Sequence, residues 1–257
     1  MKPELDDHDT SGVGMPVDGQ STKRAVILAG GRGTRLRPYT VVLPKPLMPV
    51  GEYPILEVVI RQLAHHGFTH ITMAVNHQAE LIRAFFGDGS RWNVRIDYSL
   101  EESALGTMGP LRLIPDLPDH FLVMNGDVLT DLDFATFFRT HVDEDRLFTI
   151  SSREREQRVD YGVLVSDSQR RLQQFQEKPV STYEVSMGVY AVSRRVLPFI
   201  PEQTAYGFDA LMLDLLAAGR PVHVAQFHGY WLDIGRPDDY MQAIEEFPEM
   251  KARFHIA

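Results

Sequence analysis

A short apolar run that ends in glycines lies near the start of the chain and limits the folds open to it. Ala25 to Ala29 form a continuous apolar stretch, and glycines follow at positions 30, 31 and 33. A run of this length that stops at glycines is typical of a buried strand that leaves a sheet into a tight loop. In open α/β sheets, nucleotides bind at this position.

Beyond this loop, apolar strands alternate with segments of helical periodicity, a pattern that indicates βαβ units. The predicted strands of the first half are 71–75, 94–98 and 121–124, and the predicted helices are 55–67, 79–86, 109–114 and 133–141. In the second half, strands are predicted at 148–152, 161–165, 172–176, 189–192 and 222–226, with helices at 195–200, 208–218 and 239–247. We therefore expect an α/β fold with a mostly parallel, mixed central sheet flanked by helices, which the second half extends.

The first part of the chain differs from the rest in composition. Residues 1–22 contain five Asp or Glu, three Gly and two Pro, with almost no large apolar side chains. Such a segment cannot bury enough surface to offset the entropy lost on ordering. We predict that 1–22 is a flexible tail and that 23–257 is a single domain. The tail also lacks the apolar core of a secretory signal.

Composition excludes several classes of protein. The 26 Lys and Arg against 35 Asp and Glu give a net charge of -9, and no basic stripe of a duplex-binding protein is visible, so we expect no nucleic-acid partner. The absence of cysteine excludes disulfides, zinc thiolate sites and thiol nucleophiles. Apolar stretches are far shorter than the roughly 20 residues that cross a bilayer. We expect a cytoplasmic protein without a membrane partner.

The glycine loop does not match two common phosphate-binding motifs. The dinucleotide motif requires a glycine at the position of Leu36, and no Gly-Lys-Ser/Thr of a P-loop is present. Two cations accompany the loop: Arg35, and Lys45 between two prolines that stiffen the backbone. A guanidinium and an ammonium can both hold phosphate. The alternative is a glycine turn beside solvated cations.

The stretch 28–36, followed by Pro44-Lys45-Pro46-Leu47, resembles the opening motif of the sugar-1-phosphate nucleotidyltransferases, also called NDP-sugar pyrophosphorylases. In that family the stretch binds the triphosphate in a Rossmann-like domain. The resemblance implies that Arg35 and Lys45 are catalytic cations. It also implies nucleotide-binding roles for Leu28, Gly30, Gly31, Gly33 and Thr34.

Two further segments resemble the base-recognition region of the family. They are Val75-Asn76-His77 and the stretch from Ala104 to Gly109, whose glycines would let a planar base approach the backbone. The resemblance implies that Asn76, Gly106 and Thr107 bind the nucleotide. The alternative is that these segments begin helices without binding a base.

Two aspartates are candidates for metal binding. Asp127, in Asn125-Gly126-Asp127, and Asp233, in Trp231-Leu232-Asp233, each follow an apolar strand-like run. Two carboxylates together with phosphate oxygens and water suit octahedral Mg²⁺. Taken singly, each aspartate is more simply a turn or cap residue. The resemblance favours the metal site, because the family carries a Gly-Asp and a late Trp-x-Asp that both hold the metal.

The sugar phosphate is assigned through the same resemblance. It implies that Glu177 and Lys178 bind the sugar hydroxyls and the phosphate, and that Gly162 contacts the sugar through its backbone. Ser186 and Gly188 fall in another sugar-contacting segment, where many relatives have Asn or Thr in place of Ser186. Without the resemblance, a surface ion pair and a turn glycine would be the default interpretation.

The expected reaction is transfer of a nucleotidyl group from an NTP to a sugar 1-phosphate, with release of pyrophosphate and with Mg²⁺ as cofactor. The base-recognition segments look most like mannose-1-phosphate guanylyltransferases and related heptose enzymes, which favours GTP. The alternatives within the family are thymidylyl-, uridylyl- and cytidylyltransferases. Two further alternatives are a molybdenum-cofactor or isoprenoid nucleotidyltransferase and a non-catalytic sugar-nucleotide sensor. The β-helix that many relatives append at the C-terminus is not expected here, and a homo-oligomer remains possible.

Overall fold

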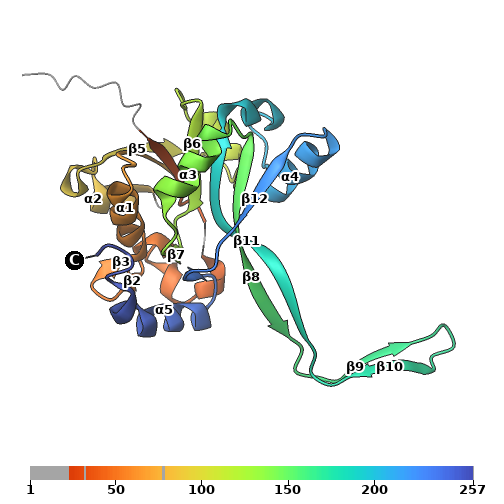
Figure 1. The fold of residues 1–257 in the computed structure, drawn as a ribbon. Helices are drawn as coiled ribbons and strands as arrows, with labels where there is room; N and C mark the ends of the chain where they lie inside the picture. Colours follow the sequence, from red (N-terminus) through yellow and green to blue (C-terminus); the bar gives the residue numbers. More distant parts are fainter. Residues whose placement is uncertain (1–22, 32, 77–78, 257) are drawn as a thin grey trace, which may run out of the picture.

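The chain forms a seven-stranded mixed sheet at its centre, in the order β12-β8-β11-β6-β1-β4-β5 (Figure 1). This computed structural model describes residues 23–31, 33–76 and 79–256, so the predicted tail 1–22 lies outside the described residues. The strands are β1 (Arg24–Leu28), β4 (His70–Val75), β5 (Arg95–Leu100), β6 (His120–Asn125), β8 (Phe148–Arg158), β11 (Val180–Ser193) and β12 (Val222–Gln226). β1, β4, β5 and β6 are parallel, whereas β11 is antiparallel to β6 and β8. The predicted mostly parallel, mixed sheet is confirmed.

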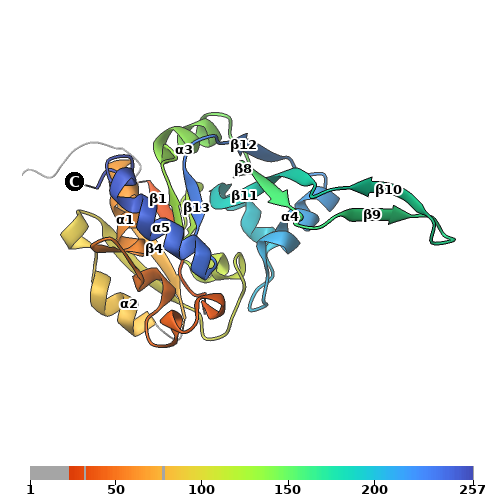
Figure 2. The same cartoon turned by 90° about the horizontal axis from the view of Figure 1, so that it is seen from below.

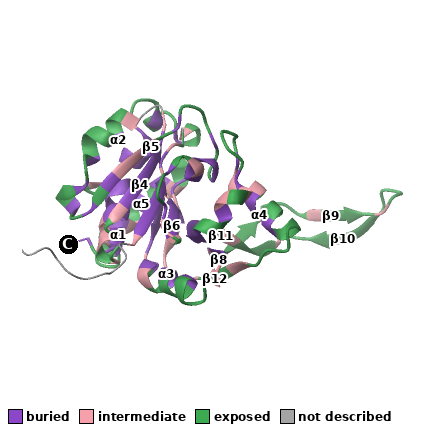
Figure 3. Cartoon of the chain, turned by 90° about the horizontal axis from the view of Figure 1, so that it is seen from above, coloured by how far each residue is buried: buried purple, intermediate pink, exposed green. Residues whose placement is uncertain are grey.

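Helices cover both faces of the sheet because successive strand residues point to opposite sides. Ile27 of β1 packs in a core with α1 (Ile55–His65), α2 (Ala79–Phe86) and α3 (Phe134–Asp143). Its neighbour Val26 packs in a second core with α4 (Phe208–Ala217) and the 3-10 segments Gly109–Leu113 and Arg194–Phe199. The buried residues, purple in Figure 3, concentrate in these layers.

The two 3-10 segments correct the predicted helices at 109–114 and 195–200. Each spans five or six residues, and each contains a proline, Pro110 or Pro198, which lacks a backbone N–H donor. Short helical segments of this kind often form i to i+3 hydrogen bonds, which define a 3-10 helix, instead of the i to i+4 bonds of an α-helix.

A third core packs under the glycine loop. It joins Leu36 and Met48 to Phe247 of α5 (Pro237–Met250). The small strands β2 (Pro49–Val50), β3 (Tyr53–Pro54), β7 (Val128–Thr130) and β13 (Trp231–Asp233) surround this core. None of the helices in the described residues has the length and apolar character needed to cross a membrane.

A long ribbon projects from this body. β8 and β11 run well beyond the predicted 148–152 and 189–192, and β9 (Val163–Ser166) pairs only with β10 (Leu172–Gln176). Residues 153–185 are called the arm below. Figures 1 and 2 both show the arm extending away from the body. The expectation that β9 and β10 extend the central sheet was wrong, because apolar patterning marks a strand without choosing its neighbour.

Candidate active site

A cleft of about 460 Å³ opens at the carboxyl ends of the parallel strands. Side chains and backbone from the ends of β1, β4, β5 and β6 reach it, since these ends share one edge of the sheet. Its lining includes Leu28, Gly30, Gly31, Arg35, Lys45, Asn76, Glu101, Gly106, Thr107, Asn125 and Asp127. Most of the residues predicted for the nucleotide therefore lie together in one cleft.

Lys45 and Asp127, which both line the cleft, form an ion pair. Lys45 begins a 3-10 turn between two prolines and is only 9% exposed. Asp127 follows β6, after a glycine whose N–H donates to the carbonyl of Leu28 at 3.1 Å. Two segments 82 residues apart thus place opposite charges in contact.

Asp233 joins this pair from the other end of the chain. β13 pairs antiparallel with β7, which sets Asp233 opposite Val128, one residue after Asp127. Burial raises the pKa of the Asp233 carboxyl, the charge of Asp127 raises it further, and Lys45 and Arg35 oppose the rise. Two carboxylates and two cations therefore lie within electrostatic range of one another.

The residues present fit a magnesium ion held partly by substrate. Among the described residues, no three His, Cys, Asp or Glu side chains lie close enough to form a metal site of their own. Mg²⁺ is usually bound by one or two carboxylates, with phosphate oxygens and water completing its octahedron. The repulsion between Asp127 and Asp233 would fall if a cation lay between them.

The glycine loop is held against the ends of β4 and β5. The side chain of Asn76 donates to the carbonyl oxygen of Gly30. Glu101, only 8% exposed, accepts from the N–H of Leu105 at 3.1 Å, and burial raises its pKa. A Cβ on Gly30 would lie 2.9 Å from Oε1 of Glu101, so a side chain there would displace the Glu101 carboxylate.

Glu101 is a cleft residue that the sequence prediction missed. The predicted strand ended at Tyr98, whereas β5 runs to Leu100 and so places Glu101 at the functional edge of the sheet. A strand end predicted two residues further along would have identified it.

Gly106 and Thr107 line the cleft and also anchor the chain before α4. Gly106 has φ +76°, and a Cβ there would lie 2.7 Å from the carbonyl oxygen of Tyr206. Thr107 Oγ1 accepts from the N–H of Phe208 at 2.7 Å. The hydroxyl of Thr107 accepts this bond and keeps its own O–H as a donor, so the segment offers both a close backbone approach and a hydroxyl donor.

Gly33 and Thr34 lie behind the cleft lining rather than in it. Gly33 has φ +59°, and its carbonyl oxygen accepts from the hydroxyl of Thr40 at 2.7 Å. A Cβ at Gly33 would lie 3.3 Å from that of Lys45, so the glycine keeps the loop close to the lysine. Thr34 is exposed and begins a 3-10 turn that ends at the buried Leu36. His77 lies outside the described residues.

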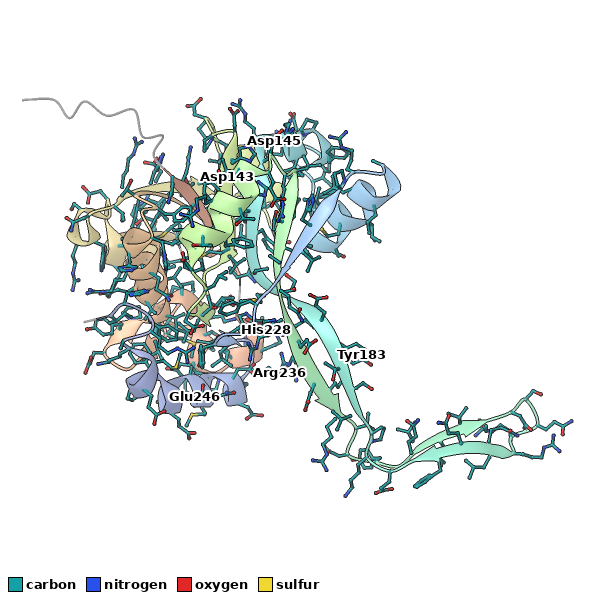
Figure 4. All side chains as sticks on the ribbon, in the orientation of Figure 1. Asp143, Asp145, Tyr183, His228, Arg236 and Glu246 are labelled. Carbon is teal, nitrogen blue, oxygen red and sulfur yellow. The ribbon has the colours of Figure 1, made fainter. Side chains whose placement is uncertain are left out.

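A second hollow, of about 720 Å³, adjoins the cleft and shares Arg35 with it. Asp233 and Arg236 line it from the body, and Arg155 and Tyr183 line it from the base of the arm. Figure 4 shows Arg236 beside the base of the arm and Tyr183 further along β11. Arg236, which the sequence prediction missed, stands three residues after Asp233, and that proximity could have identified it.

The residues predicted for the sugar phosphate fall into two groups, and the first lies near the cleft. Gly188 has φ +76°, and a Cβ there would lie 2.6 Å from Nδ2 of Asn125 in the cleft wall. Ser186 accepts from the N–H of Gly188 at 3.3 Å.

The second group, Gly162, Glu177 and Lys178, is exposed on the arm. Within this group Gly162 and Glu177 are neighbours, because a Cβ on Gly162 would lie 3.2 Å from Oε2 of Glu177. None of the three lines the cleft or the hollow of its own chain.

Comparisons with known proteins define the class. Residues 24–249 match the family described as Nucleotidyl transferase, and the chain belongs to this family. A UTP–glucose-1-phosphate uridylyltransferase of Synechocystis is 37% identical over 242 residues, covering 86% of this chain and 62% of that protein. A mannose-1-phosphate guanyltransferase of Schizosaccharomyces pombe is 35% identical over 227 residues, covering 85% and 62%. The predicted resemblance to sugar-1-phosphate nucleotidyltransferases is confirmed.

A solved structure agrees with this assignment. The crystal structure of HddC from Yersinia pseudotuberculosis, complexed with GMP-PN, superimposes with a TM-score of 0.66 at 28% identity. The match covers 88% of this chain and 99% of that one. By contrast, this chain spans 62% of the length of the two curated relatives.

Proposed function

We propose that the protein transfers a nucleotidyl group from a nucleoside triphosphate to a sugar 1-phosphate, forming an NDP-sugar and pyrophosphate. The observation that carries this proposal is the convergence of Arg35, Lys45, Asp127 and Asp233 beside a glycine loop at the end of β1. The family membership and the names of the relatives support it. A cysteine-free chain is compatible with a reducing compartment, and we propose the cytoplasm as its location.

In this reaction an oxygen of the sugar phosphate attacks the α-phosphorus as the bond from that phosphorus to the pyrophosphate oxygen breaks. The attacking phosphate is already ionised, so no general base is needed. Arg35 and Lys45 stabilise the charge that builds on the departing pyrophosphate, and Lys178 positions the attacking phosphate. Asp127 and Asp233 would hold Mg²⁺, which supplies charge neutralisation to the phosphates when bound.

The triphosphate would lie along the loop of Gly30 and Gly31, where glycines allow backbone N–H groups to approach phosphate oxygens. Leu28 lines the cleft at the end of β1, and Gly33 and Thr34 continue the loop outside that lining. The base would lie between Asn76 and the Gly106-Thr107 segment, and the sugar near Ser186 and Gly188.

GTP is the proposed nucleotide, and mannose 1-phosphate or a related hexose or heptose 1-phosphate the proposed acceptor. Guanine presents N–H donors, and the buried Glu101 carboxylate supplies acceptor oxygens in the same cleft. Relatives named as guanyltransferases and the GMP-PN complex of HddC support this choice. Replacing Glu101→Gln should lower kcat/KM for GTP by roughly 10- to 100-fold, because an amide presents a donor where a second acceptor is needed.

The proposal is tested by measuring pyrophosphate release with Mg²⁺ for each common NTP paired with each of a set of sugar 1-phosphates. We expect one strongly preferred pair, with the NDP-sugar identified by its mass. Folded protein that releases no pyrophosphate with any pair would contradict the proposal and favour a nucleotide-sugar sensor. A preference for UTP or dTTP would retain the reaction and overturn the role of Glu101.

A further inference from the structure

We propose that Arg236 of the body and Arg155 of the arm bind the phosphate of the sugar 1-phosphate in the hollow that adjoins the cleft. This inference rests on the proposed function, to which it adds two phosphate-binding residues besides Lys178. The hollow would hold the acceptor substrate, while the cleft holds the nucleoside triphosphate.

The hollow meets the cleft at the charged centre of the candidate site. Asp233 lines the hollow, whereas Asp127 lines the cleft, and Arg35 lines both. A Cβ on Gly235 would lie 3.6 Å from both Nη1 of Arg35 and Oδ2 of Asp233. A phosphate in the hollow would therefore meet the triphosphate of the cleft beside Arg35 and Asp233, where the proposed transfer takes place.

The backbone of Arg236 is fixed by the helix that it precedes. Arg236 is the N-cap residue of α5, its carbonyl oxygen accepts from the N–H of Tyr240 at 3.0 Å, and Pro237 follows at the first helical position. Tyr240 is buried, and its hydroxyl donates to the carbonyl oxygen of Pro49 at 2.7 Å. Arg236 thus starts from a rigid position three residues after Asp233, and a preorganised group loses less freedom when it binds a ligand.

Arg155 borders the same hollow from the arm. It pairs with Tyr183 in the ladder between β8 and β11, so both side chains lie on one face of the ribbon, and both line the hollow. Figure 4 shows Arg236 on the body beside the base of the arm and Tyr183 on the arm itself. Guanidinium groups from two separate elements therefore border one hollow.

Both guanidinium groups are available to a ligand. Across residues 23–31, 33–76 and 79–256, neither Arg155 nor Arg236 forms an ion pair. By contrast, Arg171 further out on the arm pairs with Asp167 at 3.0 Å. A guanidinium can hold a phosphate through two parallel hydrogen bonds, which fixes its orientation as well as its position.

The other side chains of the hollow suit the sugar part of the same ligand. Glu156 and Glu184 present carboxylate oxygens, which accept hydrogen bonds from sugar hydroxyls. The ring of Tyr183 is 53% exposed and offers an apolar face to the carbon atoms of a sugar ring. The volume of about 720 Å³ is that of a small-molecule site. A sugar phosphate matches this mixture better than a second polyphosphate, which the carboxylates would repel.

The test separates binding of the acceptor from binding of the nucleotide. Arg236→Ala and Arg155→Ala are assayed by pyrophosphate release with the preferred substrate pair, and the KM for each substrate is measured at saturation with the other. Loss of a charge-assisted hydrogen bond should raise the KM for the sugar 1-phosphate by at least about 10-fold in each variant. The KM for the NTP should change by less than about 2-fold. A thermal melt checks that each variant is folded.

Conservative variants test whether the charge of Arg236 acts on the phosphate. Arg236→Lys keeps a point charge without the planar fork, whereas Arg236→Gln keeps polar character without the charge. We expect the KM for the sugar 1-phosphate to be partly restored in Arg236→Lys and to stay as high in Arg236→Gln as in Arg236→Ala. Equal KM values in the lysine and glutamine variants would overturn the phosphate contact.

Two arginines outside both cavities provide matched controls. Arg37 follows Arg35 by two residues on the body, and Arg170 lies in the turn between β9 and β10. Both are exposed and line neither the cleft nor the hollow. Arg37→Ala and Arg170→Ala should keep wild-type KM values for both substrates. A similar rise in the KM for the sugar 1-phosphate in these controls would attribute it to the overall charge of the protein and overturn the inference.

The outcomes also separate this inference from the proposed function. Folded wild-type protein that is inactive on every substrate pair would overturn the function and the inference with it. If wild-type protein is active and a variant keeps its KM for the sugar 1-phosphate within about 2-fold, the role of that arginine is overturned while the function stands. If the KM for the NTP rises instead, the hollow binds the nucleotide, and the inference is again overturned.

Discussion

Apolar strand residues are buried in the body and exposed in the arm. In the body, Ile27 and Phe121 are completely buried between the sheet and its helices, whereas Leu164 and Phe175 in the arm lie open to solvent. The difference arises because helices cover both faces of the central sheet, whereas no helix covers the β9–β10 ribbon. Strand formation alone therefore does not stabilise a region, since most of the stabilising free energy comes from covering the strand.

The two regions also divide the proposed chemistry. The body holds the glycine loop, both cations and both carboxylates, all within one cored structure. The arm holds Glu177 and Lys178, which are proposed to bind the sugar phosphate and are exposed. The proposed triphosphate contacts thus lie on a covered sheet, whereas these two proposed sugar-phosphate contacts lie on an open ribbon.

The largest expected effect is in the body, at Lys45. Lys45→Ala should lower kcat for pyrophosphate release by about three orders of magnitude, because a preorganised charge beside the leaving group is lost. The fold should survive, since water still reaches Asp127, the partner left unpaired. Steady-state kinetics together with a thermal melt test both statements.

Lys251→Ala is the control for this prediction. Lys251 pairs with Glu52 at the surface and has no part in the cleft, so its variant should keep wild-type turnover. Wild-type turnover in Lys45→Ala would remove the lysine from the mechanism.

The next largest effect is expected in the buried core of the body and concerns the free energy of unfolding. Phe121→Ala should lower the free energy of unfolding by about 3 to 5 kcal/mol, because a fully buried ring leaves a cavity between sheet and helices. Urea titration measures the loss. The surface variant Phe85→Ala, on an exposed ring of α2, should lose far less. Similar losses in both variants would mean that the second core does not stabilise the body as described.

The sequence predicts the part of the candidate site that follows from local pattern. The apolar run and glycines at 25–33 predicted β1 and its loop, and the strand ends made Asp127 and Asp233 candidates that the resemblance then favoured. Their meeting depends on the pairing of β13 with β7, a contact between segments about 100 residues apart. Local periodicity carries no information about such a pairing, so the resemblance to a family supplied it.

The arm marks the limit of the same reasoning. The strand at 172–176 was predicted with its correct bounds, yet its sheet was not, because alternation defines two faces without showing whether anything covers them. Glu101 was missed for a smaller reason, the underestimated length of β5. Both errors concern where a strand lies in space rather than whether it forms.

A buried histidine should make the body sensitive to acid. Burial, followed by the nearby His120 and Arg146, lowers the pKa of His141 to about 3. The unfolded chain, with a histidine pKa near 6.5, therefore binds the proton first, and stability falls as pH drops below about 6.5. Between pH 7 and pH 5 the loss from this residue is about 2 kcal/mol, at roughly 1.4 kcal/mol per pH unit.

Urea titrations of wild type and His141→Gln at both pH values measure this contribution. The variant should lose about 2 kcal/mol less than wild type on acidification, and the exposed site His228→Gln should behave as wild type. Parallel pH dependence in wild type and His141→Gln would show that this histidine is not held neutral by the body.

The smallest expected effect is in the arm. Phe175→Ser, measured at a protein concentration low enough for single chains, should change the free energy of unfolding by less than about 0.5 kcal/mol, because an exposed ring contributes little packing. Urea titration measures this change. A loss above about 1 kcal/mol would mean that the ring of Phe175 is covered by the body in solution, and the contrast between a covered sheet and an open ribbon would then not hold.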